Sequence, residues 1–81
     1  MLIFKISQDV NNGYDTYSSA VVIAATEDAA RRMHPRGRYD DEDPAGDLYE
    51  WAAPKDVKVE LIGVATGDAK PRVVTASYHA G

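Results

Sequence analysis

Alternation of apolar and polar residues at the start of the chain constrains the fold more than any other feature of the sequence. In Leu2–Ser7 every second residue, starting with Leu2, is apolar, which is the period of a half-buried β-strand. Thr16–Ala25 is a second segment rich in residues that favour strands. Asn11–Gly13 lies between them as a turn signal in which Gly13 is expected to supply a positive φ, so the two strands are predicted to form an antiparallel pair.

One short helix is expected after the second strand. Thr26 is a suitable N-cap, and the two acidic residues that follow it stand where the helix macrodipole favours negative charge. Arg31 and Arg32 lie in the last turn, each four residues after an acid, so we expect both to form ion pairs within the helix. Pro35 ends the helix. Its apolar face consists of Ala29, Ala30 and Met33.

Two further strands complete the expected fold. Alternation predicts a third strand over Val57–Leu61, and a Gly/Asp/Pro loop connects it to a fourth over Arg72–Tyr78. The order β-β-α-β-β predicts a small α+β fold, with an antiparallel four-stranded sheet and one short helix on one face. Eighty-one residues form a single domain, 1–81, and we expect Trp51 in its core.

Composition excludes several classes of protein. The absence of cysteine excludes a disulfide scaffold, a thiolate zinc site and a cysteine nucleophile. Lys5 and Asp9 interrupt the apolar N-terminus, so we expect neither a signal peptide nor a membrane span, and we place the protein in the cytoplasm. The net charge of −4 argues against direct binding of nucleic acid or of an anionic membrane, and favours a basic partner.

The net charge is concentrated in one connecting segment. Tyr39–Glu50, called the acidic segment here, holds six acidic side chains and no basic one. With Arg36 and Arg38 included, residues 35–50 sum to −4, which is the formal net charge of the whole chain. Connections longer than about 12–15 residues are usually functional or disordered, and the aromatic residues here argue against full disorder. The sequence fits either a binding surface or a solvated loop that Arg36 and Arg38 partly neutralise.

The sequence contains no complete catalytic or cofactor motif. From Asp41 onward the acidic segment resembles the start of a calcium-binding loop. Alanines stand at the fifth and twelfth positions of that loop, so the ligand set is incomplete. Residues 63–70 have the wrong spacing for a phosphate loop. His34 and His79 are expected to be ordinary surface histidines rather than metal ligands or a catalytic base. We therefore expect no enzymatic activity, no cofactor and no metal.

Two segments of the sequence are distinctive: NNGYDTYSSAVV, residues 11–22, and the pattern W-x-x-P-x-D-V-x-V, residues 51–59. The chain resembles a family of small phage and prophage proteins most strongly at these two segments, and the resemblance covers nearly its whole length. This family resembles anti-CRISPR proteins that act on type I-C systems. The resemblance implies a phage protein, made in the cytoplasm of the host, that binds the crRNA-guided surveillance complex Cascade and blocks its recruitment of target DNA.

Under this implication the protein mimics DNA, because acidic side chains would replace phosphates on the basic DNA-binding surface of Cascade. Tyr39 and Tyr49 would supply directional contacts, and Tyr14 and Asp15 would extend the surface if the first turn lies on the same side. The acidic candidates are Asp40, Asp41, Glu42, Asp43, Asp47 and Glu50. We expect the protein to act as a monomer.

A second class of function stays open from the sequence. The chain could be a non-catalytic phage accessory or adaptor module that binds another host protein through a sheet edge or an aromatic loop. The acidic residues would then serve only solubility. Charge reversal in the acidic segment separates the two classes, because only the inhibitor needs these charges for binding.

Overall fold

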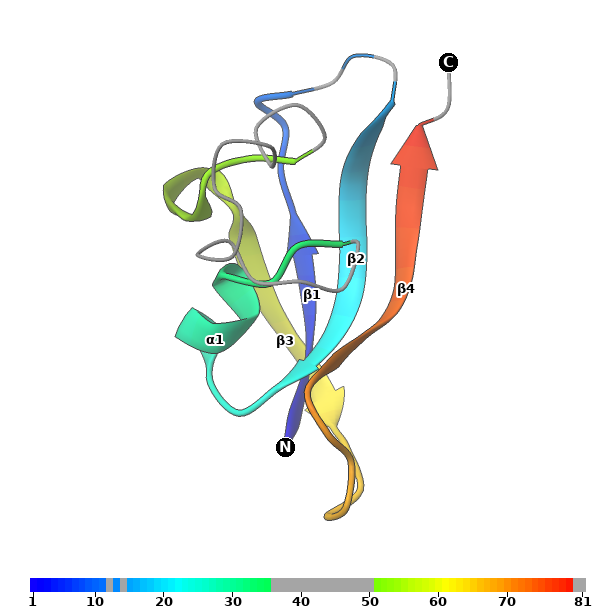
Figure 1. The fold of residues 1–81 in the computed structure, drawn as a ribbon. Coiled ribbons are helices and arrows are strands. Elements are labelled where there is room, and N and C mark those ends of the chain that lie inside the picture. The colour runs from blue at the N-terminus through cyan, green and yellow to red at the C-terminus, as the bar shows by residue number, and fades with distance from the viewer. Residues whose placement is uncertain (12, 14, 36–50, 80–81) are drawn as a thin grey trace.

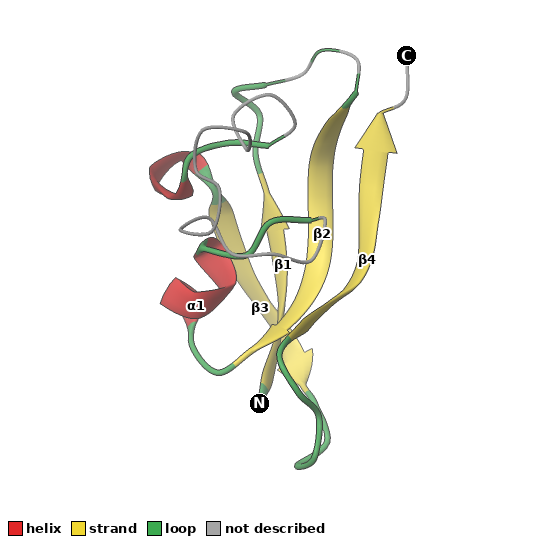
Figure 2. Cartoon of the chain, in the orientation of Figure 1, coloured by secondary structure: helices red, strands yellow, loops and turns green. Residues whose placement is uncertain are grey.

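The described part of the chain, residues 1–11, 13, 15–35 and 51–79 of a computed structural model, contains four β-strands and one short α-helix. In chain order the elements are β1 (Leu2–Ser7), β2 (Thr16–Ala24), α1 (Glu27–Arg31), the 3-10 helix η2 (Pro54–Asp56), β3 (Lys58–Val64) and β4 (Arg72–His79). The strands form one antiparallel sheet with α1 on one face (Figures 1 and 2). The predicted α+β class is confirmed, whereas the acidic segment lies outside the described residues.

The strand order in the sheet is β3-β1-β2-β4, and every neighbouring pair is antiparallel. The predicted pairing of the first two strands is therefore confirmed. β3 and β4 follow one another in the sequence but lie at opposite edges of the sheet, with both central strands between them (Figure 1). Their connection passes the N-terminus, where the Ala65 amide donates a hydrogen bond of 3.0 Å to the Met1 carbonyl.

The hydrophobic core lies between the sheet and α1. In β1, buried Phe4 and Ile6 alternate with exposed Lys5, as the period of two requires, and β2 contributes Ala20, Val22 and Ala24 to the same core. Trp51, just 1% exposed, is among the largest fully buried side chains, so its predicted place in the core is confirmed. The buried cluster comprises Phe4, Ile6, Ala20, Val22, Ala24, Ala30, Met33, Trp51, Ala52 and Val57. Small residues such as Ala30 let α1 approach the sheet closely.

Helix α1 begins as predicted, with Thr26 as its N-cap: the Thr26 hydroxyl accepts a hydrogen bond of 3.1 Å from the Ala29 amide. The predicted ion pair between Arg32 and Asp28 is present at 3.3 Å. The other predicted pair is wrong, because the Arg31 guanidinium reaches out of the helix and donates to the backbone carbonyl of Val57. Within the described residues no helix is long and apolar enough to cross a membrane.

His34 is fully buried, with 0% exposure, so the prediction of a surface histidine is wrong. The chain turns inward after α1, and His34 lies between the buried residues Met33 and Pro35. Its ring meets the ring of Tyr17 edge to face, with centroids 6.0 Å apart. The side chain of His79 lies outside the described residues.

Irregularities in pairing fall on both edge strands. The register between β1 and β3 shifts at Ile3/Phe4, which leaves Ile62 as an extra residue on β3. The register between β2 and β4 shifts at Val21/Val22, which leaves Val74 as an extra residue on β4. Each of these two β-branched side chains is 48% exposed. A third shift leaves Ser18 as the extra residue on β2.

Candidate binding site at the β1–β2 connection

Of the predicted binding residues, only Asp15 lies within the described part of the chain. It belongs to the connection between β1 and β2, residues 8–15, at one end of the sheet (Figure 1). The other predicted residues lie outside the described residues; these are Tyr14, Tyr39, Asp40, Asp41, Glu42, Asp43, Asp47, Tyr49 and Glu50. Arg36 and Arg38 do so as well.

The β1–β2 connection is organised around the side chain of Gln8, which is 5% exposed. Its amide nitrogen donates to the carbonyls of Asn11 and Tyr17, both at 2.8 Å. Its amide oxygen accepts from the backbone N–H groups of Val10 and Asn11, at 2.9 and 2.8 Å. One buried side chain therefore satisfies three backbone groups of the connection and one carbonyl of β2, which fixes the path of the connection.

The importance of Gln8 was missed at the level of sequence, although one signal was present. Leu2, Phe4, Ile6 and Gln8 stand at successive even positions, so Gln8 continues the inward-facing series of β1. A polar residue at an inward position must find hydrogen-bond partners inside the fold. That reasoning predicts a side chain that organises the following turn.

Asp15 adopts the left-handed backbone conformation, with φ of 61°. The sequence had assigned a positive φ to Gly13, and this prediction is wrong, because Gly13 lies outside the positive-φ region. Aspartate tolerates this conformation better than most residues. Beside it, the Thr16 hydroxyl donates to the Gly13 carbonyl at 2.7 Å, and the Tyr78 hydroxyl donates to Asp15 Oδ1 at 3.3 Å. The left-handed residue is therefore held from β2 and from β4.

The β1–β2 connection contacts the point where the chain leaves the acidic segment. The side-chain amide of Asn11 donates a hydrogen bond of 3.1 Å to the backbone carbonyl of Trp51. Trp51 is the first described residue after the acidic segment, and its side chain is buried. The end of the sheet that carries Asp15 is therefore the end at which Trp51 lies, one residue after the acidic segment in the sequence.

The charges of the described connection are exposed to solvent. Asp9 lies 3.4 Å from the Lys58 ammonium, but the two side chains are 71% and 72% exposed. An ion pair this exposed contributes little to stability and is screened by salt. Both aspartates of the connection, Asp9 and Asp15, are therefore placed where an approaching basic surface could reach them.

A row of aromatic rings backs this end of the sheet. Tyr17 meets buried His34 on one side, and on the other it meets Tyr78, with ring centroids 4.7 Å apart and planes tilted by 56°. Tyr78 is 41% exposed. The row runs from the core to the surface, so it gives Asp15 a rigid support through the Tyr78 hydroxyl.

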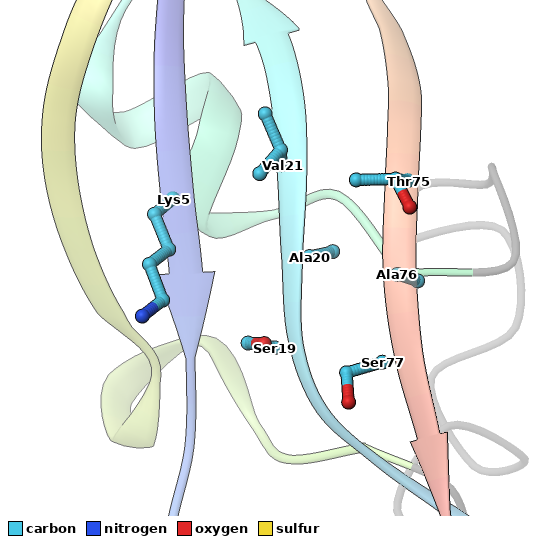
Figure 3. Close-up of a pocket in the computed structure, with 7 residues that line it drawn as sticks. All are labelled: Lys5, Ser19, Ala20, Val21, Thr75, Ala76 and Ser77. Carbon is cyan, nitrogen blue, oxygen red and sulfur yellow. The ribbon is translucent and has the colours of Figure 1, made fainter.

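A second feature lies on the opposite face of the sheet, away from α1. A hollow of about 160 Å³ lies there. Figure 3 shows the residues that line it, which are Lys5 on β1, Ser19, Ala20 and Val21 on β2, and Thr75, Ala76 and Ser77 on β4. Three of the lining side chains carry a hydroxyl group, and Lys5 is the one charged residue in the lining. Glu60 stands directly opposite Lys5 in the β1–β3 register, so the local charge is balanced.

No arrangement typical of a metal centre occurs in the described ranges, where no three His, Asp or Glu side chains gather closely enough to hold an ion. No family model, curated protein or solved structure matches this chain. The function must therefore be argued from the chain itself.

Proposed function

We propose that this protein is a non-catalytic, phage-encoded inhibitor that binds the basic DNA-binding surface of a type I Cascade complex in the host cytoplasm and blocks target DNA. The acidic segment would supply the main contacts, with carboxylates in the positions that DNA phosphates take. Asp15 and Tyr14 would extend this surface on the side of the β1–β2 connection.

The observation that carries the proposal is the hydrogen bond between Asn11 and the Trp51 carbonyl. It joins the β1–β2 connection, which carries Asp15, to Trp51, the residue that directly follows the acidic segment in the sequence. The concentration of charge also supports the proposal. Outside residues 35–50 the chain carries seven acidic and seven basic side chains, which cancel. An approaching basic surface would therefore be steered toward the acidic segment.

Charge reversal tests the proposal. We expect the variant with Asp40, Asp41, Glu42 and Asp43 all changed to Lys to lose binding to purified Cascade. Titration of the wild-type protein should release labelled target DNA from Cascade, and this competition should weaken as salt is raised. Tryptophan fluorescence and urea unfolding would verify that the variant is folded.

A matched control separates the site from the net charge. Changing Glu27, Asp28, Glu60 and Asp68 to Lys alters the formal charge by the same amount, but these residues lie on α1, on β3 and in the β3–β4 connection. We expect this control to keep most of its affinity. Equal loss in both variants, or unchanged affinity in the first, would contradict the proposed site. Capture of a different host protein would favour the adaptor function instead.

A further inference from the structure

Along its outer edge, β4 has no neighbouring strand in the described part of the chain. Among the described residues β4 pairs with β2 alone, so the backbone N–H and C=O groups on its other side face no strand (Figure 1). Such an edge is a ready template for another strand, and natural sheets usually protect edges with charged side chains, proline or bulges.

The other edge of the same sheet carries this protection. β3 has Lys58 and Glu60 along its length, and its bulge places Ile62 out of register with β1. The Arg31 guanidinium donates a hydrogen bond to the carbonyl of Val57, the residue directly before β3. A second strand would meet charge and irregular backbone on this edge.

Along most of its length, β4 lacks charged side chains, proline and bulges. Its one Lys, Arg, Asp or Glu residue is Arg72, at the first position, and it contains no proline. Its bulge residue, Val74, is also near the start. From Thr75 to Tyr78 the strand is uncharged and carries no extra residue. This stretch is therefore an unprotected edge.

Residues 74–78, which are this stretch together with the bulge residue Val74 before it, are complementary to a second copy of themselves. In an antiparallel pair of two β4 strands centred on Ala76, Val74 stands opposite Tyr78 of the second copy, and Thr75 stands opposite Ser77. Aromatic with β-branched and Thr with Ser are two of the cross-strand pairs that stabilise sheets. The pairing would cover Val74 and Tyr78, which are 48% and 41% exposed. The antiparallel direction also keeps the two Arg72 side chains at opposite ends.

We propose that two copies of the chain form a symmetric dimer through β4, with the two-fold axis at Ala76 and one continuous sheet of eight strands, four from each copy. This replaces the expectation of a monomer. Its test is independent of the proposed inhibitor function, because Thr75, Ala76 and Ser77 can be altered while Asp15, Tyr78 and the acidic segment are left unchanged.

Two charge variants test the register. In the proposed dimer, Thr75→Lys with Ser77→Lys sets lysine against lysine twice, whereas Thr75→Lys with Ser77→Glu sets lysine against glutamate twice. Both positions are exposed, so both variants should fold, as far-UV circular dichroism would verify. By sedimentation equilibrium we expect a dimer for the wild type and for the Lys/Glu variant. We expect the dissociation constant of the Lys/Lys variant to rise by about tenfold or more.

A disulfide gives a second readout. Residues directly opposed in an antiparallel pair have Cα atoms about 4.5–5.5 Å apart, which suits a disulfide. Because the chain has no cysteine, Ala76→Cys would introduce a single thiol. We expect it to oxidise to a covalent dimer much faster than the control Glu60→Cys on β3. A monomeric wild type at millimolar concentration, an unchanged dimer in the Lys/Lys variant, or equal oxidation of the two cysteine variants would overturn the proposal.

Discussion

The side-chain amide of Asn11 lies 3.1 Å from the backbone carbonyl of Trp51 and donates a hydrogen bond to it across forty positions of sequence. A turn between two neighbouring strands is thereby attached to the chain that enters β3 from the acidic segment. The attachment is directional, since an amide N–H donates and a carbonyl accepts. It therefore fixes the orientation of the turn relative to Trp51 as well as the distance between them.

Removing this hydrogen bond should destabilise the fold at the end of the sheet that carries the β1–β2 connection. We expect Asn11→Ala to lower the free energy of unfolding by about 1 kcal/mol, because the carbonyl of Trp51 loses a partner. Urea unfolding followed by fluorescence would measure it, since Trp51 is the single tryptophan of the chain. Ser18→Ala, an exposed position on β2, should change stability by less than about 0.5 kcal/mol and serves as the control.

Gln8 should be more sensitive than Asn11. Gln8→Leu removes the partner of two backbone N–H groups and one carbonyl of the connection and of the Tyr17 carbonyl in β2, at a cost of about 3 kcal/mol or more. Gln8→Glu keeps an oxygen for the two N–H groups but loses the donor to the two carbonyls, so we expect an intermediate loss at pH 7. Equal stability of Gln8→Leu and wild type in urea would show that the connection does not depend on this side chain.

The two arginines of α1 should differ, although the sequence treats them alike. Arg31→Ala removes a charged donor from the carbonyl of Val57, and we expect a loss of about 1.5–3 kcal/mol. Arg32→Ala removes an exposed ion pair with Asp28 and should cost about 0.5 kcal/mol or less. Thermal unfolding of the two variants in parallel would measure the difference. A larger loss for Arg32→Ala would contradict the assignment.

Local patterns of the sequence were sufficient to predict the four strands and α1, but not the 3-10 helix η2. The alternation in Leu2–Ser7, the cap at Thr26 and the burial of Trp51 each depend on chemistry within a few residues, and each is confirmed. The strand order was not predicted, because it depends on which edge of the β1–β2 pair β3 and β4 join. No periodicity encodes that choice.

The predictions that were wrong also depend on contacts between residues far apart in the sequence. Arg31 has a good local partner in Glu27, yet it reaches Val57, because a buried carbonyl near β3 has greater need of a donor than an exposed carboxylate. His34 was expected at the surface because it follows a short helix, and tertiary packing against Tyr17 places it in the core instead. Of the predicted binding residues, the structure locates Asp15, and the contact between Asn11 and Trp51 required knowledge of the fold.

Asp15 allows its charge to be separated from its backbone conformation. Its φ of 61° would strain an alanine by about 1 kcal/mol, and the Tyr78 hydroxyl would also lose its acceptor, so we expect Asp15→Ala to cost about 1–2 kcal/mol. Asp15→Gly relieves the strain but not the lost hydrogen bond, so it should be less destabilising. Asp15→Asn keeps both a residue that tolerates this conformation and an oxygen for Tyr78, and its stability should stay within about 0.5 kcal/mol of wild type.

Asp15→Asn then tests the effect of the Asp15 charge on binding separately from its effect on stability. If Asp15 takes part in the proposed contact with a basic surface, Asp15→Asn should weaken Cascade binding several-fold at low salt and much less at high salt, with unfolding in urea unchanged. Asp68→Asn, in the connection between β3 and β4, removes the same charge at the other end of the sheet and should leave binding unchanged. Equal effects of the two substitutions would mean that binding responds to net charge, and would remove Asp15 from the proposed surface.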